Sequence, residues 1–263
     1  MNVTDKFLEG KHLGDEGIID HHMHIGMVAP FYSCAFQVES LFAKMNLIGI
    51  QAGIISCIAG SGDFQEGNRD VERAVRTYPG RFFGSVMLNP KYPDEIEEEL
   101  YRCWDTGCFR GIKLHPVLNG YPINGEHYCR IYKIAAELNC PVLIHTWGTE
   151  DIRQFADLAS RFDSTVFILA HSGGEIPAVL EASKLARKYP RIYLDTACSW
   201  TYYGLLEAMV KEAGSRKVLF GSDAMWNSIE AALGRVVLSN ISESEKREII
   251  SLNARRLFSL EDL

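Results

Sequence analysis

Residues 18–26 of the chain read IIDHHMHIG, an apolar run that carries three histidines. A β-strand alternates its side chains between two faces, so this spacing predicts that Asp20, His22 and His24 share one face. Two imidazoles on one face of a strand supply half of a metal site. An isolated His-x-His pair is more often a surface or hydrogen-bonded feature, so the interpretation depends on whether later strands bring matching ligands to the same point.

Outward from this stretch, short apolar runs alternate with helical patterns along the chain. The runs predict strands at residues 17–26, 53–58, 81–88, 109–115, 141–147, 165–171, 191–196 and 217–223. Several runs are apolar almost throughout, as expected of parallel strands that are buried on both faces. This alternation predicts an α/β fold, a closed (β/α)8 TIM barrel formed by a single domain over residues 1–263, with an open doubly wound sheet as the alternative.

The composition is that of an ordinary globular chain. Of its 263 residues, 47% are hydrophobic and 23% are charged, which is enough for one large core. The formal net charge is -7 and Lys and Arg do not cluster, so we expect no nucleic-acid partner and no membrane partner. The seven cysteines are scattered and form no Cys-x-x-Cys pair, which indicates a reducing compartment. Without an apolar leader or a run of about 18 apolar residues, the sequence predicts a cytoplasmic protein.

Polar residues occupy the C-terminal ends of the predicted strands. They are His22 and His24 on the first strand, Lys113 and His115 on the fourth, His145 on the fifth, His171 on the sixth and Asp223 on the eighth. In a (β/α)8 barrel these ends face one mouth, where active sites are found. Single residues also have structural explanations: His145 as a core histidine, Asp223 as a helix cap and Lys113 as a snorkelling side chain. One metal site explains the whole set, and we therefore prefer it.

Three imidazoles and a carboxylate favour a borderline divalent ion, Zn2+ first and Mn2+ second. The lack of thiolates at these positions argues against a structural zinc site. An ion with an open coordination position lowers the pKa of bound water to about 7, so that water becomes a usable nucleophile. The pattern therefore predicts a metal-dependent enzyme.

Motifs spread over nearly the whole chain resemble one known family. After DHHMH at 20–24 come GIKLHP at 111–116, PVLIH at 141–145, AHSGG at 170–174, LFGSD at 219–223 and NARRLF at 253–258. Together they resemble the amidohydrolase superfamily, in particular its amidohydrolase-related branch of metal-dependent TIM-barrel hydrolases and decarboxylases. The resemblance implies a distorted (β/α)8 barrel that carries one or two divalent ions.

The resemblance also implies roles for individual residues. His22, His24 and His145 would be metal ligands. Asp223 would be a further ligand that also handles the proton of the metal-bound water. His171 would polarise the substrate or orient that water, and in two-metal members the equivalent histidine is itself a ligand. Asp223 and His171 are therefore the predicted catalytic residues.

Lys113 can be interpreted in two ways. In two-metal members of the superfamily, a lysine at the end of the fourth strand is carboxylated and bridges the metals. The Lys-Leu-His-Pro pattern instead resembles the one-metal branch, whose corresponding side chains contact substrate, so we favour one ion over two. Lys113 and His115 share a strand face, and such a cationic pair favours a substrate that bears a carboxylate.

Aromatic residues gather near the predicted mouth: Phe31, Tyr32, Trp147, Trp200 and Trp226. They either wall a pocket for a flat or ring-shaped substrate or simply pack the upper rim of the barrel. Under the first interpretation Trp147 joins Lys113 and His115 as a substrate-binding residue.

Three functions are consistent with the sequence. The first is a metal-dependent hydrolase of a small ester, lactone or amide, which the short loops favour because decarboxylating members of the branch tend to be longer. The second is a metal-dependent nonoxidative decarboxylase, a carboxy-lyase, of an aromatic or muconate-type acid. The third is an inactive barrel that only binds metal or a partner. The expected partner is a small-molecule substrate, and a homodimer is a further expectation because dimers are common among such barrels.

Overall fold

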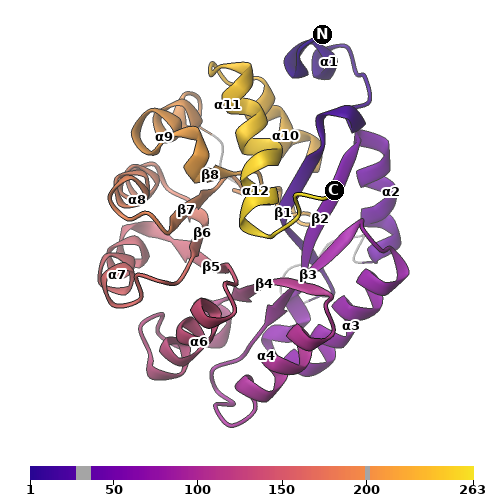
Figure 1. Ribbon diagram of the computed structural model, residues 1–263. Coiled ribbons are helices and arrows are strands. Elements are labelled where there is room, and N and C mark those ends of the chain that lie inside the picture. Colours follow the sequence, from indigo (N-terminus) through magenta and orange to yellow (C-terminus); the bar gives the residue numbers. More distant parts are fainter. Residues whose placement is uncertain (28–36, 199–201) are drawn as a thin grey trace.

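Eight parallel strands form the centre of the molecule (Figure 1). The computed structural model describes residues 1–27, 37–198 and 202–263. The strands are β1 (Ile18–Ile25), β2 (Ile50–Cys57), β3 (Phe82–Met87), β4 (Phe109–Leu114), β5 (Val142–Trp147), β6 (Phe167–Gly173), β7 (Ile192–Asp195) and β8 (Val218–Leu219). Each strand pairs with the next one along the chain, from β1 to β8. The predicted (β/α)8 barrel is thus confirmed.

The barrel closes between β1 and the segment that follows β8. The backbone N–H of His21 donates to the carbonyl of Phe220 at 3.1 Å, and the N–H of Asp223 donates to the carbonyl of His22 at 2.8 Å. These bonds take the place of a regular ladder between the first and last strands. The closing seam therefore lies directly beside the histidines of β1.

Most strand ends fall within two residues of the predicted ranges, but two strands differ by more. The eighth strand was expected at 217–223 but ends at Leu219, and Asp223 has a φ of 60°, which lies outside the β region. The second strand begins at Ile50, earlier than expected, because Gly49 ends the preceding helix. Gly49 has a φ of 99°, a conformation that glycine adopts without steric cost.

Helices surround the barrel on the outside (Figure 1). They are α2 (Val38–Ile48), α3 (Phe64–Thr77), α4 (Ile96–Asp105), α6 (Glu126–Glu137), α7 (Gly148–Arg161), α8 (Ile176–Lys188), α9 (Leu205–Ala213) and α10 (Ile229–Val237), with the short α1 (Val3–Leu8) and α5 (Pro116–Asn119) in addition. In α3, for example, the carboxylate of Asp63 caps the helix by accepting the backbone N–H of Glu66 at 3.0 Å. In the described parts of the chain, no helix has the length and apolar character that crossing a membrane requires.

The C-terminal segment covers one end of the barrel (Figure 1). It consists of α11 (Glu243–Arg247), a π-helical turn (Glu248–Leu252) and α12 (Asn253–Leu257). The side-chain amide of Asn253 donates to the carbonyl of Val218 at 2.7 Å, which ties α12 to β8.

The core has two parts. A large cluster lies between the strands and the helices. A smaller cluster contains apolar residues of the strands together with residues of the C-terminal segment: Ile19, Ala52, Ile54, Leu143, Ile168, Ala170, Leu219, Ala254, Phe258 and Leu260. Because Phe258 and Leu260 belong to it, the C-terminal segment packs against the inner face of the barrel, where the ring of Phe258 lies 6.2 Å from that of His21.

Truncation of a core aromatic tests this packing. Phe167 on β6 is fully buried, and its ring lies 5.0 Å from that of Tyr132 and 5.7 Å from that of Phe155. We expect Phe167→Ala to lower the free energy of unfolding by about 3–5 kcal/mol, because it leaves a cavity among aromatic rings. Urea unfolding followed by circular dichroism measures the change. As the control, Leu47→Ala removes a side chain that is 71% exposed and should shift stability by no more than about 0.5 kcal/mol.

Candidate metal centre

Three potential ligands converge inside the barrel mouth. His22 and His24 come from β1, Asp223 comes from the segment after β8, and all three are buried. The two histidine Nε2 atoms lie 3.1 Å apart. Oδ1 of Asp223 lies 3.2 Å from Nε2 of His24 and 3.6 Å from Nε2 of His22. These atoms surround one point, as the ligands of a single ion do.

The carboxylate of Asp223 is incompletely satisfied. Among the described residues, none donates a hydrogen bond to its buried Oδ1 atom. Buried polar atoms in folded proteins nearly always have a partner. An unpaired carboxylate oxygen that faces two imidazole nitrogens fits a bound cation, so the residues present suit the expected divalent ion.

The face assignment predicted for β1 is partly wrong. The expectation was that Asp20 shares a face with His22 and His24 while His21 points away. The structure has a register shift between Asp20 and Met23, and both His21 and His22 reach the carboxylate of Asp195. In a bulge, two residues of one strand lie opposite a single residue of the partner strand. The strict alternation of side chains between the two faces therefore does not hold there.

Asp195, at the end of β7, orients the first ligand. Its Oδ2 atom accepts a hydrogen bond from Nδ1 of His22 at 2.7 Å and one from the backbone N–H of His171 at 3.0 Å. Its Oδ1 atom accepts the backbone N–H of Ala197 at 2.9 Å. Because a carboxylate only accepts, Nδ1 of His22 carries the proton and Nε2 keeps its lone pair toward the site. The sequence prediction missed this residue, although an Asp at a strand end matched the signal used for the others.

His24 is held in a similar way. Its Nδ1 atom lies 2.9 Å from Oγ of Ser56 on β2, so its Nε2 atom also faces the site. Burial lowers the pKa of His24, and it lowers that of His22 well below the usual value. Both rings are therefore neutral at physiological pH, which is the form that binds metal.

Three further histidines form a row beside this group. Nε2 of His171 lies 3.1 Å from Nδ1 of His145, and the rings of His145 and His115 stack with centroids 3.8 Å apart. Nδ1 of His171 lies 2.9 Å from the carbonyl of Ala197, an acceptor, so that nitrogen carries the proton. Nε2 of His171 then accepts from Nδ1 of His145, which leaves Nε2 of His145 as a lone-pair nitrogen. The tautomer of His145 therefore suits a ligand.

The structure does not bring the ligand atoms of all four predicted metal ligands close together. In the described parts of the chain, there are two groups of three potential ligands whose atoms lie within 4.8 Å of one another inside the group. One group is His22, His24 and Asp223, and the other is His22, His171 and Asp195. His145 belongs to neither group and contacts His171 instead. Its role as a ligand stays a prediction.

Lys113 lies inside the site. It is buried, and its Nζ atom lies 2.9 Å from Nε2 of His22. Burial lowers its pKa to about 8, although Asp223 and Asp195 oppose this shift. Burial alone would raise the pKa of Asp223, but the contact with His24 and nearby positive charge outweigh it and hold the pKa below its usual value. Asp223 is therefore ionised next to a buried amine.

Two of the predicted aromatic residues lie close to histidines of the site. The ring of Trp226 lies 5.1 Å from that of His24, and the ring of Trp147 lies 6.0 Å from that of His171. The other predicted aromatics, Phe31, Tyr32 and Trp200, lie outside the described residues.

Comparison with known proteins adds to this geometry. The family model described as Amidohydrolase matches residues 19–260. Among solved structures, the chain is similar to 2,6-dihydroxybenzoate decarboxylase from Rhizobium, with a TM-score of 0.75, 18% identity, and coverage of 93% of this chain and 99% of that one.

Two other similar structures carry different activities. One is 5-carboxyvanillate decarboxylase from Novosphingobium aromaticivorans, complexed with manganese, with a TM-score of 0.75, 14% identity, and coverage of 95% of this chain and 98% of that one. The other is a probable 2-pyrone-4,6-dicarboxylic acid hydrolase from Acinetobacter baumannii, with a TM-score of 0.74, 16% identity, and coverage of 92% and 99%. At these identities the likeness concerns the fold.

Metal analysis of purified variants tests the ligand assignment. We expect the native protein, loaded with Mn2+ or Zn2+ and dialysed, to keep about one ion per chain. His22→Ala and Asp223→Ala should lose it because each removes a converging ligand, whereas His171→Ala should keep it. Two ions in the native protein, with one lost in His171→Ala, would contradict the one-ion site and make Lys113 a carboxylated bridge.

A second variant tests the orienting role of Asp195. Asp195→Asn keeps the shape but no longer fixes the proton on Nδ1 of His22, and we expect metal affinity to fall by about 10–100-fold. Competition with a chelator of known affinity measures the change. The control is Asp151→Asn, because that carboxylate also accepts a backbone N–H, from Trp147 at 2.8 Å, but lies outside the ligand group. Equal affinities for Asp195→Asn and the native protein would contradict the role.

Proposed function

The chain belongs to the amidohydrolase family, and on that premise we propose that it is a metal-dependent nonoxidative decarboxylase of an aromatic acid. The observation that carries this proposal is a buried group of potential cation ligands, His22, His24 and Asp223, with the amine of Lys113 directly beside it. Such a site is complementary to a substrate with several negatively charged oxygens.

The proposal reverses the order of the two enzymatic functions expected from the sequence. Short loops favoured hydrolysis there, but the decarboxylase from Rhizobium aligns with this chain over 99% of its own length. Length therefore gives no argument against decarboxylation. The decarboxylases of 2,6-dihydroxybenzoate and 5-carboxyvanillate among the similar structures support the new order.

The donor set fits a divalent ion, held by His22, His24 and Asp223 with His145 as the predicted fourth ligand. A nitrogen and oxygen donor set suits both Mn2+ and Zn2+, and the manganese in similar structures puts Mn2+ first. When bound, the ion would act as a Lewis acid toward oxygen atoms of the substrate.

The remaining residues bind and orient the acid. Protonated Lys113 is a compact positive charge inside the mouth, so it attracts the negative oxygens of a carboxylate or phenolate. The rings of Trp147 and Trp226 border the same space and offer flat apolar contacts to a substrate ring. Because the side chains of His24, Lys113 and Asp223 are buried, charge interactions among them and with a bound acid are stronger than in water.

Decarboxylation needs a proton at the carbon that loses the carboxyl group. The bond between that carbon and the carboxylate breaks, its electron pair stays on the carbon, carbon dioxide leaves and the carbon takes up a proton. Asp223 is ionised, so it first accepts a proton from a hydroxyl group of the substrate and then delivers it to the carbon. His171 contacts the carbonyl of Ala197 and Nδ1 of His145, and through the latter we assign it the positioning of His145.

Hydrolysis of a lactone is the second candidate. An ionised Asp223 is equally able to accept a proton from an attacking water. The similarity to a probable 2-pyrone-4,6-dicarboxylic acid hydrolase favours a ring-shaped dicarboxylate as its substrate. Both candidates therefore share an anionic ring and differ in the bond that breaks.

Direct assay separates the two candidates. With Mn2+ present, we expect carbon dioxide release from 2,6-dihydroxybenzoate or 5-carboxyvanillate and no ring opening of 2-pyrone-4,6-dicarboxylate, each followed by ultraviolet absorbance and by headspace analysis. Asp223→Asn should lower kcat by about 10²–10⁴-fold because the proton relay is lost. Asp163→Asn, at an exposed site, serves as the control. Ring opening without carbon dioxide release would decide for the hydrolase.

A further inference from the structure

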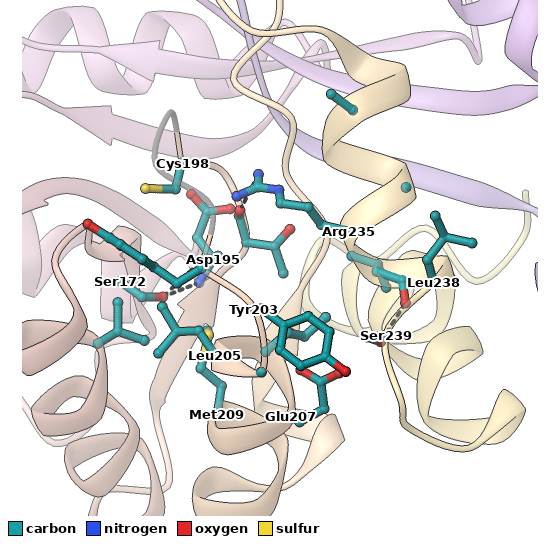
Figure 2. A pocket seen from close by; sticks show the side chains of 18 of the residues that line it. Ser172, Asp195, Cys198, Tyr203, Leu205, Glu207, Met209, Arg235, Leu238 and Ser239 are labelled. Carbon is teal, nitrogen blue, oxygen red and sulfur yellow. Dashed lines mark hydrogen bonds between the residues drawn. The ribbon is translucent and has the colours of Figure 1, made fainter.

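A cavity of about 860 Å³ lies between helices α9 and α10 and the ends of β6 and β7 (Figure 2). Its size is that of a site for a small organic molecule. His171, Ser172 and Asp195 form part of its wall, but none of the converging ligands His22, His24 and Asp223 is among the described residues that line it. The cavity therefore borders the metal centre and shares His171 and Asp195 with its surroundings, while its remaining wall comes from other elements.

Most of the wall is apolar. It is formed by side chains of α9 and α10, with one residue each from α1 and α8: Leu205, Leu206, Met209, Val236, Phe7 and Val179. Leu238, just after α10, lines the cavity and is 51% exposed. An apolar surface of this extent favours an apolar ligand body.

One positively charged side chain, that of Arg235, lines this mostly apolar cavity. The side chain of Arg235 reaches from α10 toward Asp195 and Cys198 (Figure 2). Its Nη2 atom donates to the carbonyl of Thr196 at 2.9 Å. Within the described parts of the chain, no carboxylate lies within 4.0 Å of its guanidinium group. A guanidinium offers five N–H donors, so most of its capacity is left over.

The acidic residues of the wall are engaged elsewhere. Glu230 pairs with Lys44 at 2.6 Å, and Glu207 accepts the backbone N–H of Asn240 at 2.8 Å. Asp195 uses both oxygens on His22 and on backbone N–H groups. Burial lowers the pKa of Arg235, and Asp195 and Cys198 oppose this shift, although no carboxylate of the described residues forms an ion pair with the guanidinium. An anion from outside is the partner that this group lacks.

We propose that this cavity binds an amphipathic monocarboxylate, whose carboxylate pairs with Arg235 and whose apolar chain lies along Leu205, Met209 and Leu238. A carboxylate matches the planar fork of a guanidinium and forms two parallel hydrogen bonds with it. This site goes beyond the proposed decarboxylase function and does not depend on it, because the proposed contacts use Arg235, Leu205, Met209 and Leu238 and none of His22, His24 and Asp223.

Calorimetric titration of the metal-loaded protein tests the proposal. The probes are decanoate and 1-decanol, which share a chain length and differ in the charge. We expect decanoate to bind at least about tenfold more tightly than decanol, because only the acid pairs with Arg235. Arg235→Met should abolish this preference, Arg235→Lys should retain part of it, and Arg216→Met, at an exposed arginine outside the cavity, should leave it unchanged.

Two further variants locate the bound acid. Met209→Trp fills the cavity while keeping Arg235, so it should weaken decanoate binding with an unchanged circular dichroism spectrum. Asp223→Asn, which disturbs the metal centre, should bind decanoate like the native protein. Loss of binding in Asp223→Asn, equal binding of decanoate by Arg235→Met and the native protein, or no binding to the native protein at about 1 mM would each overturn the proposal. Because the readout is binding, failure of the decarboxylation assay does not affect it.

Discussion

Hydrogen bonds between β1 and the segment after β8 close the barrel, and the candidate metal centre exists only where they form. The bond from the N–H of Asp223 to the carbonyl of His22 joins the backbones of two predicted ligands directly. A carboxylate from one end of the chain is thereby set against imidazoles from the other. The positive φ of Asp223 follows from the same constraint, because the chain must turn out of the strand to aim the carboxylate inward.

Charge balance is the second requirement of this mouth. Burying Asp195, Asp223 and Lys113 together is costly unless each finds partners. Asp195 finds them in two backbone N–H groups and in His22, so it is a fixed part of the framework. Asp223 keeps one oxygen without a donor among the described residues, which makes it the group that an added cation completes. Neutral imidazoles, favoured by burial, complete the ligand set without adding charge.

The sequence predicted the parts of this site that depend on local patterns. Strand ends are marked by apolar runs, so the positions of His22, His24 and Asp223 at one mouth followed from alternation and barrel geometry. The side of β1 that His21 faces depends on a bulge, which is set by pairing with β2 and not by the local pattern. Asp195 lies at a strand end like the predicted residues. Its role depends on the contact with His22, which comes from a distant part of the sequence, and the local pattern therefore did not predict it.

The contact between His145 and His171, and the cavity around Arg235, depend on how strands and helices pack. The spacing of residues within one segment of the sequence does not determine how far apart α9 and α10 lie. The order of hydrolase and decarboxylase likewise rested on loop length, a property of the whole chain that the residues of the site do not determine.

The closing seam also gives the site an order of assembly in time. Synthesis runs from the N-terminus, so His22 and His24 leave the ribosome long before Asp223 does. An unfinished chain has the imidazole pair but neither the carboxylate nor the backbone bonds that hold it in place. The complete ligand group therefore forms only once the segment around Asp223 has joined β1, and a product that ends before Asp223 should bind metal poorly. Bound metal would thus mark molecules whose barrel has closed.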